Sequence, residues 1–315
     1  MNIKKTAITL AAIFGFALLI GGCSGTDQSN NHNNNNKTNT PTKFDNTVSQ
    51  WQNGSVTYIN GPDLPAAYDG NLNAAPALYD VDNNGTLDLV VGDASGYITI
   101  MINDSHDGIN IVNSYMIGDA SGPSYFCADA APAVFDAGDG YWDLIVGCGD
   151  GTAMYLDFYD LTPGAMVALE GPAILDGTTL VLAGGYAVPT VGHFSDANDS
   201  LYDVVIGAGD GSVNYYINSG TLDAPEFTTE FRVGVFGTRA AVASGDLNAD
   251  GLSDFVVGNA AGDVYACQGL TAECDLVLNT GSLAKPAVGD FNHDGLMDLV
   301  IGSADGSIKI ITASR

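Results

Sequence analysis

One pentapeptide pattern, an aspartate followed by three apolar residues and a glycine, occurs five times in this chain of 315 residues. The leading aspartates are 55, 60, 51 and 44 residues apart. The copies, numbered one to five in chain order, are Asp88–Gly92, Asp143–Gly147, Asp203–Gly207, Asp254–Gly258 and Asp298–Gly302. A pattern that returns at this spacing is typical of folds in which one supersecondary unit is repeated.

Each copy has strand candidates on both sides. A segment of small residues precedes it, as in Ala75-Pro76-Ala77, and a two-residue turn such as Asp150-Gly151 follows it. Asp-Gly between apolar segments favours a tight hairpin, because type I′ turns need positive φ. One unit is then an inner strand, an acidic loop, an apolar strand, a tight turn, a third strand and a more variable fourth strand. Five such units predict an all-β fold, a five-bladed β-propeller of four-stranded antiparallel blades.

The alternative fold is a β-sandwich, which also uses antiparallel hairpins but does not require the same pattern five times. In a propeller the apolar strands are covered on both faces by neighbouring blades, which explains their continuous Val, Ile and Leu content. The fifth copy ends near Thr312, without room for a fourth strand. The segment Gly54–Asn60 has strand character and no blade of its own. We therefore predict that this N-terminal strand closes the ring.

Oxygen-bearing side chains occupy fixed positions in the acidic loops of copies one, four and five. They stand at positions 1, 3, 5 and 9, with glycine at position 6 and a backbone carbonyl available at position 7. Ca²⁺ takes about six to eight oxygens in flexible geometry, whereas Mg²⁺ keeps more water and Zn²⁺ prefers His or Cys. The predicted ligand residues are Asp80, Asp82, Asn84, Thr86, Asp88, Asp246, Asn248, Asp250, Leu252, Asp254, Asp290, Asn292, Asp294, Leu296 and Asp298. A metal-free Asx-turn motif is the alternative, but it leaves adjacent like charges unneutralised.

The loops and the pentapeptide together resemble the FG-GAP/VCBS repeat family, whose propellers include the head of integrin α-subunits and many bacterial surface proteins. The resemblance covers essentially all of residues 54–312. It implies about three structural Ca²⁺ sites, one in each complete loop. Copies two and three depart from the pattern. The second loop, Asp136 to Asp143, is one residue short, and in the third His193 takes position 1 and two residues are inserted.

The N-terminus has the layout of an export signal. Lys4 and Lys5 precede an apolar segment of about 15 residues, which is too short to span a bilayer as a helix. The segment ends at Ile20-Gly21-Gly22-Cys23, which resembles the lipobox of bacterial lipoproteins. We therefore predict a signal peptide at 1–22, lipidation at Cys23, an Asn-rich tether at 23–50 and a propeller at 51–315. The alternative is an ordinary signal peptide followed by a stray cysteine.

These features predict a protein of the bacterial cell envelope, held at the outer membrane through its N-terminal lipid only and facing the periplasm or the surface. With 9 basic and 37 acidic residues in the whole chain, the surface repels phosphates, which argues against nucleic acid as a partner. Four cysteines remain after Cys23, and their proximity in sequence suggests two disulfides, with free buried thiols as the alternative. The suggested pairs are Cys127 with Cys148 and Cys267 with Cys274.

The sequence holds no nucleophile, phosphate-binding or metalloprotease motif, so we expect a monomeric binding, adhesion or scaffold module with a protein or glycan ligand. The alternative is a polysaccharide lyase or hydrolase, since some lyases use related propellers. In a propeller the turns after the apolar strands share one face with the connections between blades. Aromatic residues on that face can stack on sugars or anchor a peptide. The candidates, which could equally pack between blades, are Tyr68, Tyr125, Tyr186, Phe236 and Arg239.

Overall fold

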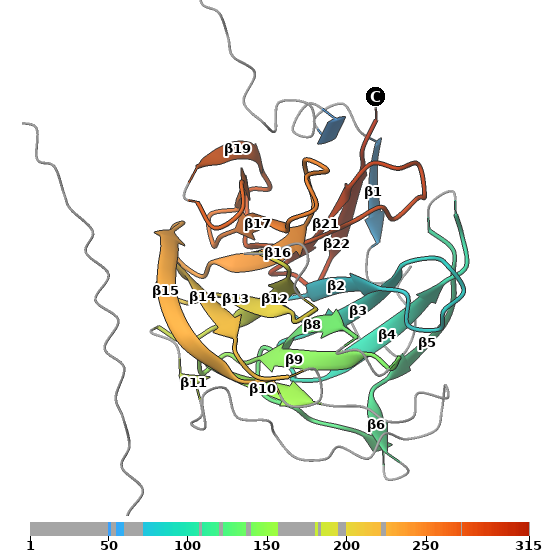
Figure 1. Cartoon of the computed structure of the whole chain (residues 1–315). Coiled ribbons are helices and arrows are strands. Elements are labelled where there is room, and N and C mark those ends of the chain that lie inside the picture. The colour runs from blue at the N-terminus through green and yellow to red at the C-terminus, as the bar shows by residue number, and fades with distance from the viewer. Residues whose placement is uncertain are drawn as a thin grey trace, which may run out of the picture. The chain divides into compact units, whose positions relative to one another are not determined.

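The computed structural model describes residues 50–51, 55–59, 72–106, 109–119, 122–136, 140–156, 180–181, 184–194, 200–221, 225–271 and 273–314. Within these ranges the chain forms antiparallel sheets of four strands around a common axis (Figure 1). The predicted five-bladed β-propeller is confirmed. Within the same ranges, no helix is both long and apolar enough to cross a bilayer.

The blades follow one another along the chain. Blade one contains β2 (Ala75–Tyr79), β3 (Asp88–Gly92), β4 (Ile98–Asn103) and β5 (Ile111–Met116). Blade two contains β8 (Ala131–Phe135), β9 (Asp143–Gly147), β10 (Thr152–Leu156) and β11 (Leu180–Val181). Blade three contains β12 (Val188–Gly192), β13 (Asp203–Gly207), β14 (Ser212–Asn218) and β15 (Phe227–Val235). Blade four contains β16 (Ala241–Gly245), β17 (Asp254–Gly258), β18 (Asp263–Cys267) and β19 (Cys274–Asn279).

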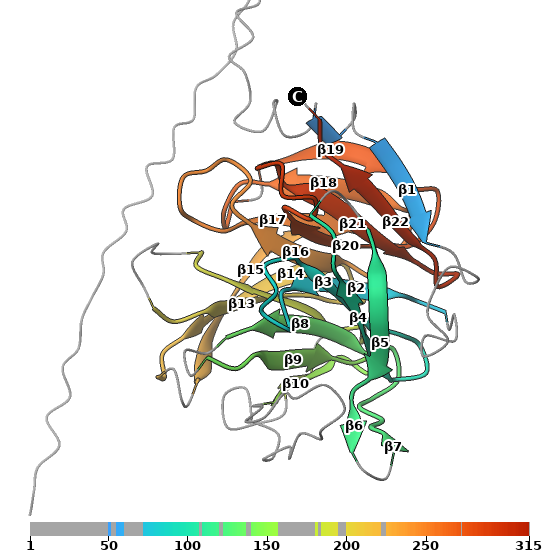
Figure 2. The same ribbon diagram turned by 90° about the vertical axis from the view of Figure 1, so that its right-hand side faces the viewer.

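Blade five is assembled from both ends of the propeller sequence. Its order is β20 (Ala284–Gly289), β21 (Asp298–Ser303), β22 (Ile308–Thr312) and then β1 (Ser55–Ile59). β1 pairs with β22 in an antiparallel register that runs from Ser55 opposite Thr312 to Ile59 opposite Ile308. The two strands lie side by side in both views (Figures 1 and 2). The prediction that an N-terminal strand closes the ring is therefore confirmed.

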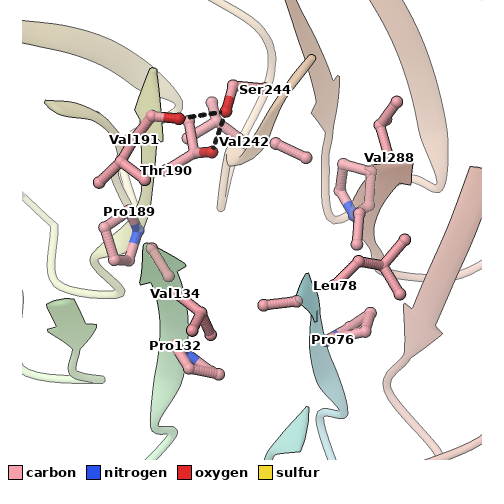
Figure 3. Close-up of a pocket in the computed structure, with 15 residues that line it drawn as sticks. Pro76, Leu78, Pro132, Val134, Pro189, Thr190, Val191, Val242, Ser244 and Val288 are labelled. Carbon is pink, nitrogen blue, oxygen red and sulfur yellow. Dashed lines mark hydrogen bonds between the residues drawn. The ribbon is translucent and has the colours of Figure 1, made fainter. Parts of the chain in front are cut away.

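The first strand of each blade lies at the axis. β2, β8, β12, β16 and β20 contact one another in a ring and surround a cavity of about 130 Å³ (Figure 3). Each pairs with only one other strand of its sheet, so a proline such as Pro76, Pro132 or Pro189 removes no ladder hydrogen bond at the free edge. The side chains that line this narrow channel are mostly small or apolar, and its accessible surface also includes polar atoms of the same strands.

The core of the propeller lies between the blades. In β3, the side chain of Val90 packs against blade two, while its neighbours Leu89 and Val91 pack against blade five. The same division recurs in β9, β13, β17 and β21, each of which contributes to two core clusters. Both faces of these strands are therefore buried, which is why their sequences are continuously apolar rather than alternating.

The contact between neighbouring blades explains the glycine that ends each pentapeptide. A Cβ at Gly92 would lie 2.2 Å from the carbonyl oxygen of Ala130, which precedes the inner strand of the next blade. A Cβ at Gly258 would lie 2.2 Å from the Ala284 oxygen, and one at Gly302 would lie 2.2 Å from the Ala74 oxygen. The last of these contacts joins blade five to blade one. Glycine is thus required because one blade's backbone lies directly against the next, not because of its φ.

We expect Gly258→Ala to destabilise the fold by about 3 kcal/mol, the upper part of the range for overpacking a core, because the methyl group would meet backbone rather than a movable side chain. Gly245→Ala is the matched control, since its Cβ would lie 3.3 Å from a methyl group of Val288. Denaturant unfolding of both variants measures the difference. Equal midpoints for the two variants would contradict this explanation of the repeat.

Candidate metal sites and binding face

The acidic loops of blades one, four and five have the same backbone conformation. Position 4 is left-handed in all three, with φ of 56° at Asn83, 57° at Ala249 and 57° at His293. The glycine at position 6 also has positive φ, between 81° and 89°. Non-glycine residues seldom adopt this region. Three loops of different composition therefore share one unusual turn, which brings alternate side chains toward the loop interior.

The aspartate at position 1 holds this turn through its two oxygens. In blade one, the Asn84 and Gly85 N–H groups donate to Oδ1 and Oδ2 of Asp80 at 3.0 and 2.9 Å. Asp246 and Asp290 accept the equivalent pairs of hydrogen bonds in blades four and five, at 2.9 to 3.0 Å. These contacts are Asx-turn bonds, and each oxygen retains a second lone pair for a cation.

The aspartate at position 9 ties the loop to the end of the third strand. Asp88 accepts from the Val81 N–H at 2.9 Å and from the Asn103 N–H at 2.8 Å. Asp254 and Asp298 accept corresponding bonds in their own blades. In blade three, which lacks a complete loop, Asp203 still accepts from the Asn218 N–H at 2.9 Å. Position 9 therefore has a structural role even where the other loop residues are missing.

Burial raises the pKa of Asp88, Asp254 and Asp298 to about 6. The backbone N–H groups oppose this effect, while neighbouring carboxylates add to it, as Asp82 does for Asp88 and Asp294 for Asp298. Each loop thus concentrates negative charge around a buried carboxylate, and no basic side chain is among the groups that shift the pKa of these three aspartates. Such an arrangement favours either protonation or a bound cation.

Two observations test whether these residues fit a calcium ion. In blade one, carboxylate oxygens of Asp80, Asp82 and Asp88 all lie within 4.8 Å of one another. In blade four, Oδ1 and Nδ2 of Asn248 are buried and have no hydrogen-bond partner among the described residues. An unsatisfied buried amide is costly, and its oxygen is a ligand that Ca²⁺ accepts. The oxygen-rich loops and this orphaned amide fit Ca²⁺.

The residues at position 7 have further contacts. The Thr86 side chain is buried, and its Oγ1 donates to Asn84 Oδ1 at 2.6 Å and to the Asn103 carbonyl. The N–H groups of Leu252 and Leu296 donate to the position-5 aspartates Asp250 and Asp294 at 3.0 and 2.8 Å. These bonds place position 7 beside position 5. Coordination by the carbonyl oxygens at position 7 stays a prediction.

The loops of blades two and three differ from these three. In blade two, the Gly140 N–H donates to Asp136 at 3.2 Å, while residues 137–139 lie outside the described part. In blade three, the His193 ring stacks on Tyr202 with centroids 4.5 Å apart, and its Nδ1 lies 3.1 Å from the Leu201 oxygen. Residues 195–199 lie outside the described part. His193 is therefore a packing residue here.

Two disulfides join the cysteine pairs that are close in sequence. Cys127–Cys148 connects the blade one to blade two connection with the residue that follows β9. Cys267–Cys274 joins opposite positions of the neighbouring strands β18 and β19. Cys23 lies outside the described residues.

The face opposite the acidic loops is formed by the turns after the apolar strands and by the connections between blades. These two kinds of segment hydrogen-bond to each other, as in the Phe126 N–H donating to the Gly96 oxygen and the Tyr186 N–H donating to the Gly149 oxygen. We call this surface the connection face. The hairpin of β6 (Gly118–Asp119) and β7 (Gly122–Pro123) belongs to one connection and projects beyond the end of β5 (Figure 2).

The candidate ligand residues separate into different environments on this face. Tyr125 is 61% exposed and packs edge-on against Tyr97. The Arg239 guanidinium lies 3.9 Å above the centre of the Tyr186 ring. Phe236 packs against the rings of Phe255 and Tyr265, so it is a core residue. Tyr68 lies outside the described residues.

Residues that the sequence analysis did not select lie beside Arg239 and Tyr186. Lys285, in β20, is 3% exposed, and its Nζ donates to the Asn73 oxygen at 3.1 Å. Asn73 in turn donates through Nδ2 to Asp129 at 2.6 Å. A lysine in an amphipathic strand is normally expected at the solvent face, so only the ring topology reveals that this one is buried near the axis.

A family model described as FG-GAP repeat matches residues 284–311. The chain is thus a five-bladed β-propeller that contains an FG-GAP repeat. No curated protein matches it.

Solved structures with low sequence identity are also similar. BBS1N, crystallised in complex with ARL6DN, is 13% identical over 78% of this chain and 62% of its own, with a TM-score of 0.37. BamB from Moraxella catarrhalis is 15% identical over 79% of this chain and 61% of its own, with a TM-score of 0.32. A mutant of AofleA from Arthrobotrys oligospora is 10% identical over 76% and 68%, with a TM-score of 0.48.

Proposed function

We propose that this chain is a calcium-stabilised binding module of the bacterial cell envelope, held to a membrane by a lipid on Cys23, that binds a protein or glycan ligand through its connection face. The observation that carries the proposal is the chemical difference between the two ends of the propeller. One end is occupied by the acidic loops, and the other presents Arg239 stacked on Tyr186, together with Tyr125, which is more exposed than Tyr141 in the acidic loop of blade two.

The acidic loops serve stability in this proposal. The hydrogen bonds from position 9 join each loop to the end of the third strand, so an ion held by the loop would also hold the blade together. Ion binding to the folded state alone stabilises that state by linkage. A catalytic role for the ions is not needed to explain the arrangement.

The connection face serves recognition. Its exposed tyrosine offers an amphipathic ring of the kind that anchors protein and sugar ligands. The connections between blades vary in length and sequence, whereas the turns and three of the five acidic loops repeat. A surface that varies on a constant scaffold can carry specificity without altering the fold.

The test compares two exposed tyrosines at opposite ends of the propeller. Tyr125→Ala alters the connection face, and Tyr141→Ala, at 44% exposure in the blade two acidic loop, is the matched control. We expect a glycan array and a cross-linking capture from envelope extract to identify a ligand whose binding falls about tenfold or more in the Tyr125 variant, as for an interface anchor, and changes little in the control. A ligand that depends on Tyr141 and not on Tyr125 would place the binding surface at the wrong end.

A further inference from the structure

The end of the central channel at the connection face is surrounded by residues in an unusual backbone conformation. Each stands two residues before an inner strand, and each has left-handed φ: 64° at Asn73 and 54° at Asp129, Tyr186 and Arg239. This region is unfavourable for large side chains such as Tyr and Arg. We call these four residues and Lys285 the channel mouth.

Arg239 is held at the mouth with hydrogen-bonding capacity unused. Its guanidinium stacks on Tyr186, which leaves the in-plane N–H groups directed away from the ring. Nε and Nη2 are buried and have no acceptor among the described residues. Buried charged donors without acceptors are costly. The arrangement therefore lacks the planar acceptor that a guanidinium binds best, which is a carboxylate.

Lys285 supplies a second cation at the same place. The corresponding positions of the other inner strands are occupied by Ala75, Ala131, Val188 and Ala241. The Lys285 ammonium has three N–H donors, and its hydrogen bond in the described structure is to the Asn73 oxygen. Burial lowers the pKa of Lys285 to about 8. The carboxylates of Asp129 and Asp93 act to raise this pKa, and the Arg239 guanidinium acts to lower it further. Groups from several blades thus act on one ammonium, which shows that they converge on the axis.

The scarcity of basic residues makes this convergence notable. The chain has 9 lysines and arginines against 37 acidic residues. Among the described residues, Arg232 lies 4.0 Å from Asp210, but neither Arg239 nor Lys285 has a carboxylate within salt-bridge distance. Two cations thus stand together without an ion pair to any described residue, although Asp129 and Asp93 are near enough to affect the pKa of Lys285.

We propose that the channel mouth binds the free C-terminal carboxylate of a peptide or protein, with Arg239 and Lys285 as donors and Tyr186 as the surface that orients Arg239. This inference rests on the proposed function, because it places the ligand on the connection face. The channel continues along the inner strands below the mouth, and its volume of about 130 Å³ suits a small final side chain.

The charge of the whole molecule also favours a single carboxylate over a polymer of acidic sugars. Each additional negative charge on the ligand would be repelled by the acidic surface around the mouth. A chain terminus brings one carboxylate to the two cations and leaves the remainder of the ligand free to be neutral or basic. A chain terminus is therefore attracted to Arg239 and Lys285 without the repulsion that further negative charges would meet.

The experiment uses the whole purified protein and a library of tetrapeptides with free C-termini, beside the same library amidated. Binding is measured by equilibrium dialysis with mass-spectrometric detection. We expect free acids to bind roughly 10- to 100-fold more tightly than amides, the range for losing a charge-assisted hydrogen bond, with enrichment of small final residues. Arg239→Gln should give a similar loss, and Arg232→Gln, the matched control, should change binding less than about twofold because the exposed ion pair of Arg232 is weak.

Lys285→Met separates binding from folding. If the lysine serves the ligand, this variant should lose binding and keep or raise its melting temperature, because a buried charge is replaced by an apolar chain. If Arg239→Gln does not fold, Tyr186→Leu tests the same role of Arg239 in binding. This variant removes the ring on which the guanidinium stacks and keeps the cation, and it should also weaken binding of the free acids. Equal binding of acids and amides, or tighter binding of an oligogalacturonate probe than of the peptides, would overturn the inference. Absence of peptide binding, with Tyr125-dependent capture intact, would overturn it and leave the proposed function standing.

Discussion

Removal of calcium with EDTA is expected to lower the melting temperature of the protein by roughly 15–30 °C. The figure follows from three sites, each contributing about 2.7 kcal/mol when the free ion is at 100 times its dissociation constant. For a domain of this size, each kcal/mol corresponds to about 2–4 °C. The three complete loops carry this expectation because, in each, the buried aspartate at position 9 joins a backbone N–H of the loop to one at the end of the third strand.

Single-loop variants show whether the effect comes from these loops. Asp250→Asn removes one charge from the blade four loop and should reduce the calcium-dependent part of the melting temperature by about a third, if the sites contribute equally. Asp305→Asn is the matched control, since Asp305 lies in a turn on the connection face, where it accepts from the Ser307 N–H at 3.0 Å. Melting is followed by calorimetry with calcium, with magnesium and with chelator. Identical melting temperatures in calcium and EDTA would rule out the assignment.

The pKa of the buried aspartates determines the direction of a pH effect. Asp88, Asp254 and Asp298 have a pKa of about 6 in the metal-free fold, above the value of about 3.9 in an unfolded chain. The folded state therefore binds more protons between these values, and metal-free stability falls as pH rises through that window. Calcium competes with those protons. The melting-temperature difference between calcium and EDTA samples should accordingly be larger near about pH 7.5 than near about pH 5.

The propeller could be predicted from the sequence because its repeated features are local. The pentapeptide marks a strand buried on both faces, and the Asp-Gly turns mark the hairpins that follow it. The purpose of its glycine could not be predicted, since the contact of Gly302 with the Ala74 oxygen joins residues at opposite ends of the propeller sequence. The β6–β7 hairpin was not predicted either, because two-residue strands carry no periodicity.

The channel mouth shows where sequence reasoning stops. Arg239 and Tyr186 were selected as separate members of a face, and the structure stacks them. Lys285 was not selected, because nothing near it in sequence indicates a site. Its neighbours Asn73 and Asp129 are more than 150 residues away. Such a cluster is created by ring closure, which brings the first and last blades together.

Deletion of residues 50–60 is expected to abolish the monomeric fold. The deletion removes β1, which pairs with β22 over its whole length and completes blade five. It also removes Trp51, which is 2% exposed in the core cluster of blades four and five and whose Nε1 donates to the Met297 oxygen at 2.5 Å. Loss of a buried tryptophan side chain alone costs about 3–5 kcal/mol, against a total stability of about 5–15 kcal/mol for a typical protein.

The remaining propeller would expose the edge of β22, and an unpaired apolar strand recruits another chain. We therefore expect the truncated protein to be unfolded or oligomeric by analytical ultracentrifugation, while Trp51→Ala alone lowers the melting temperature and stays monomeric. Deletion of residues 28–40, in the predicted tether, is the control and should leave the melting temperature unchanged. A truncated protein that stays monomeric with an unchanged melting temperature would mean that β1 lies on blade five without holding the ring closed.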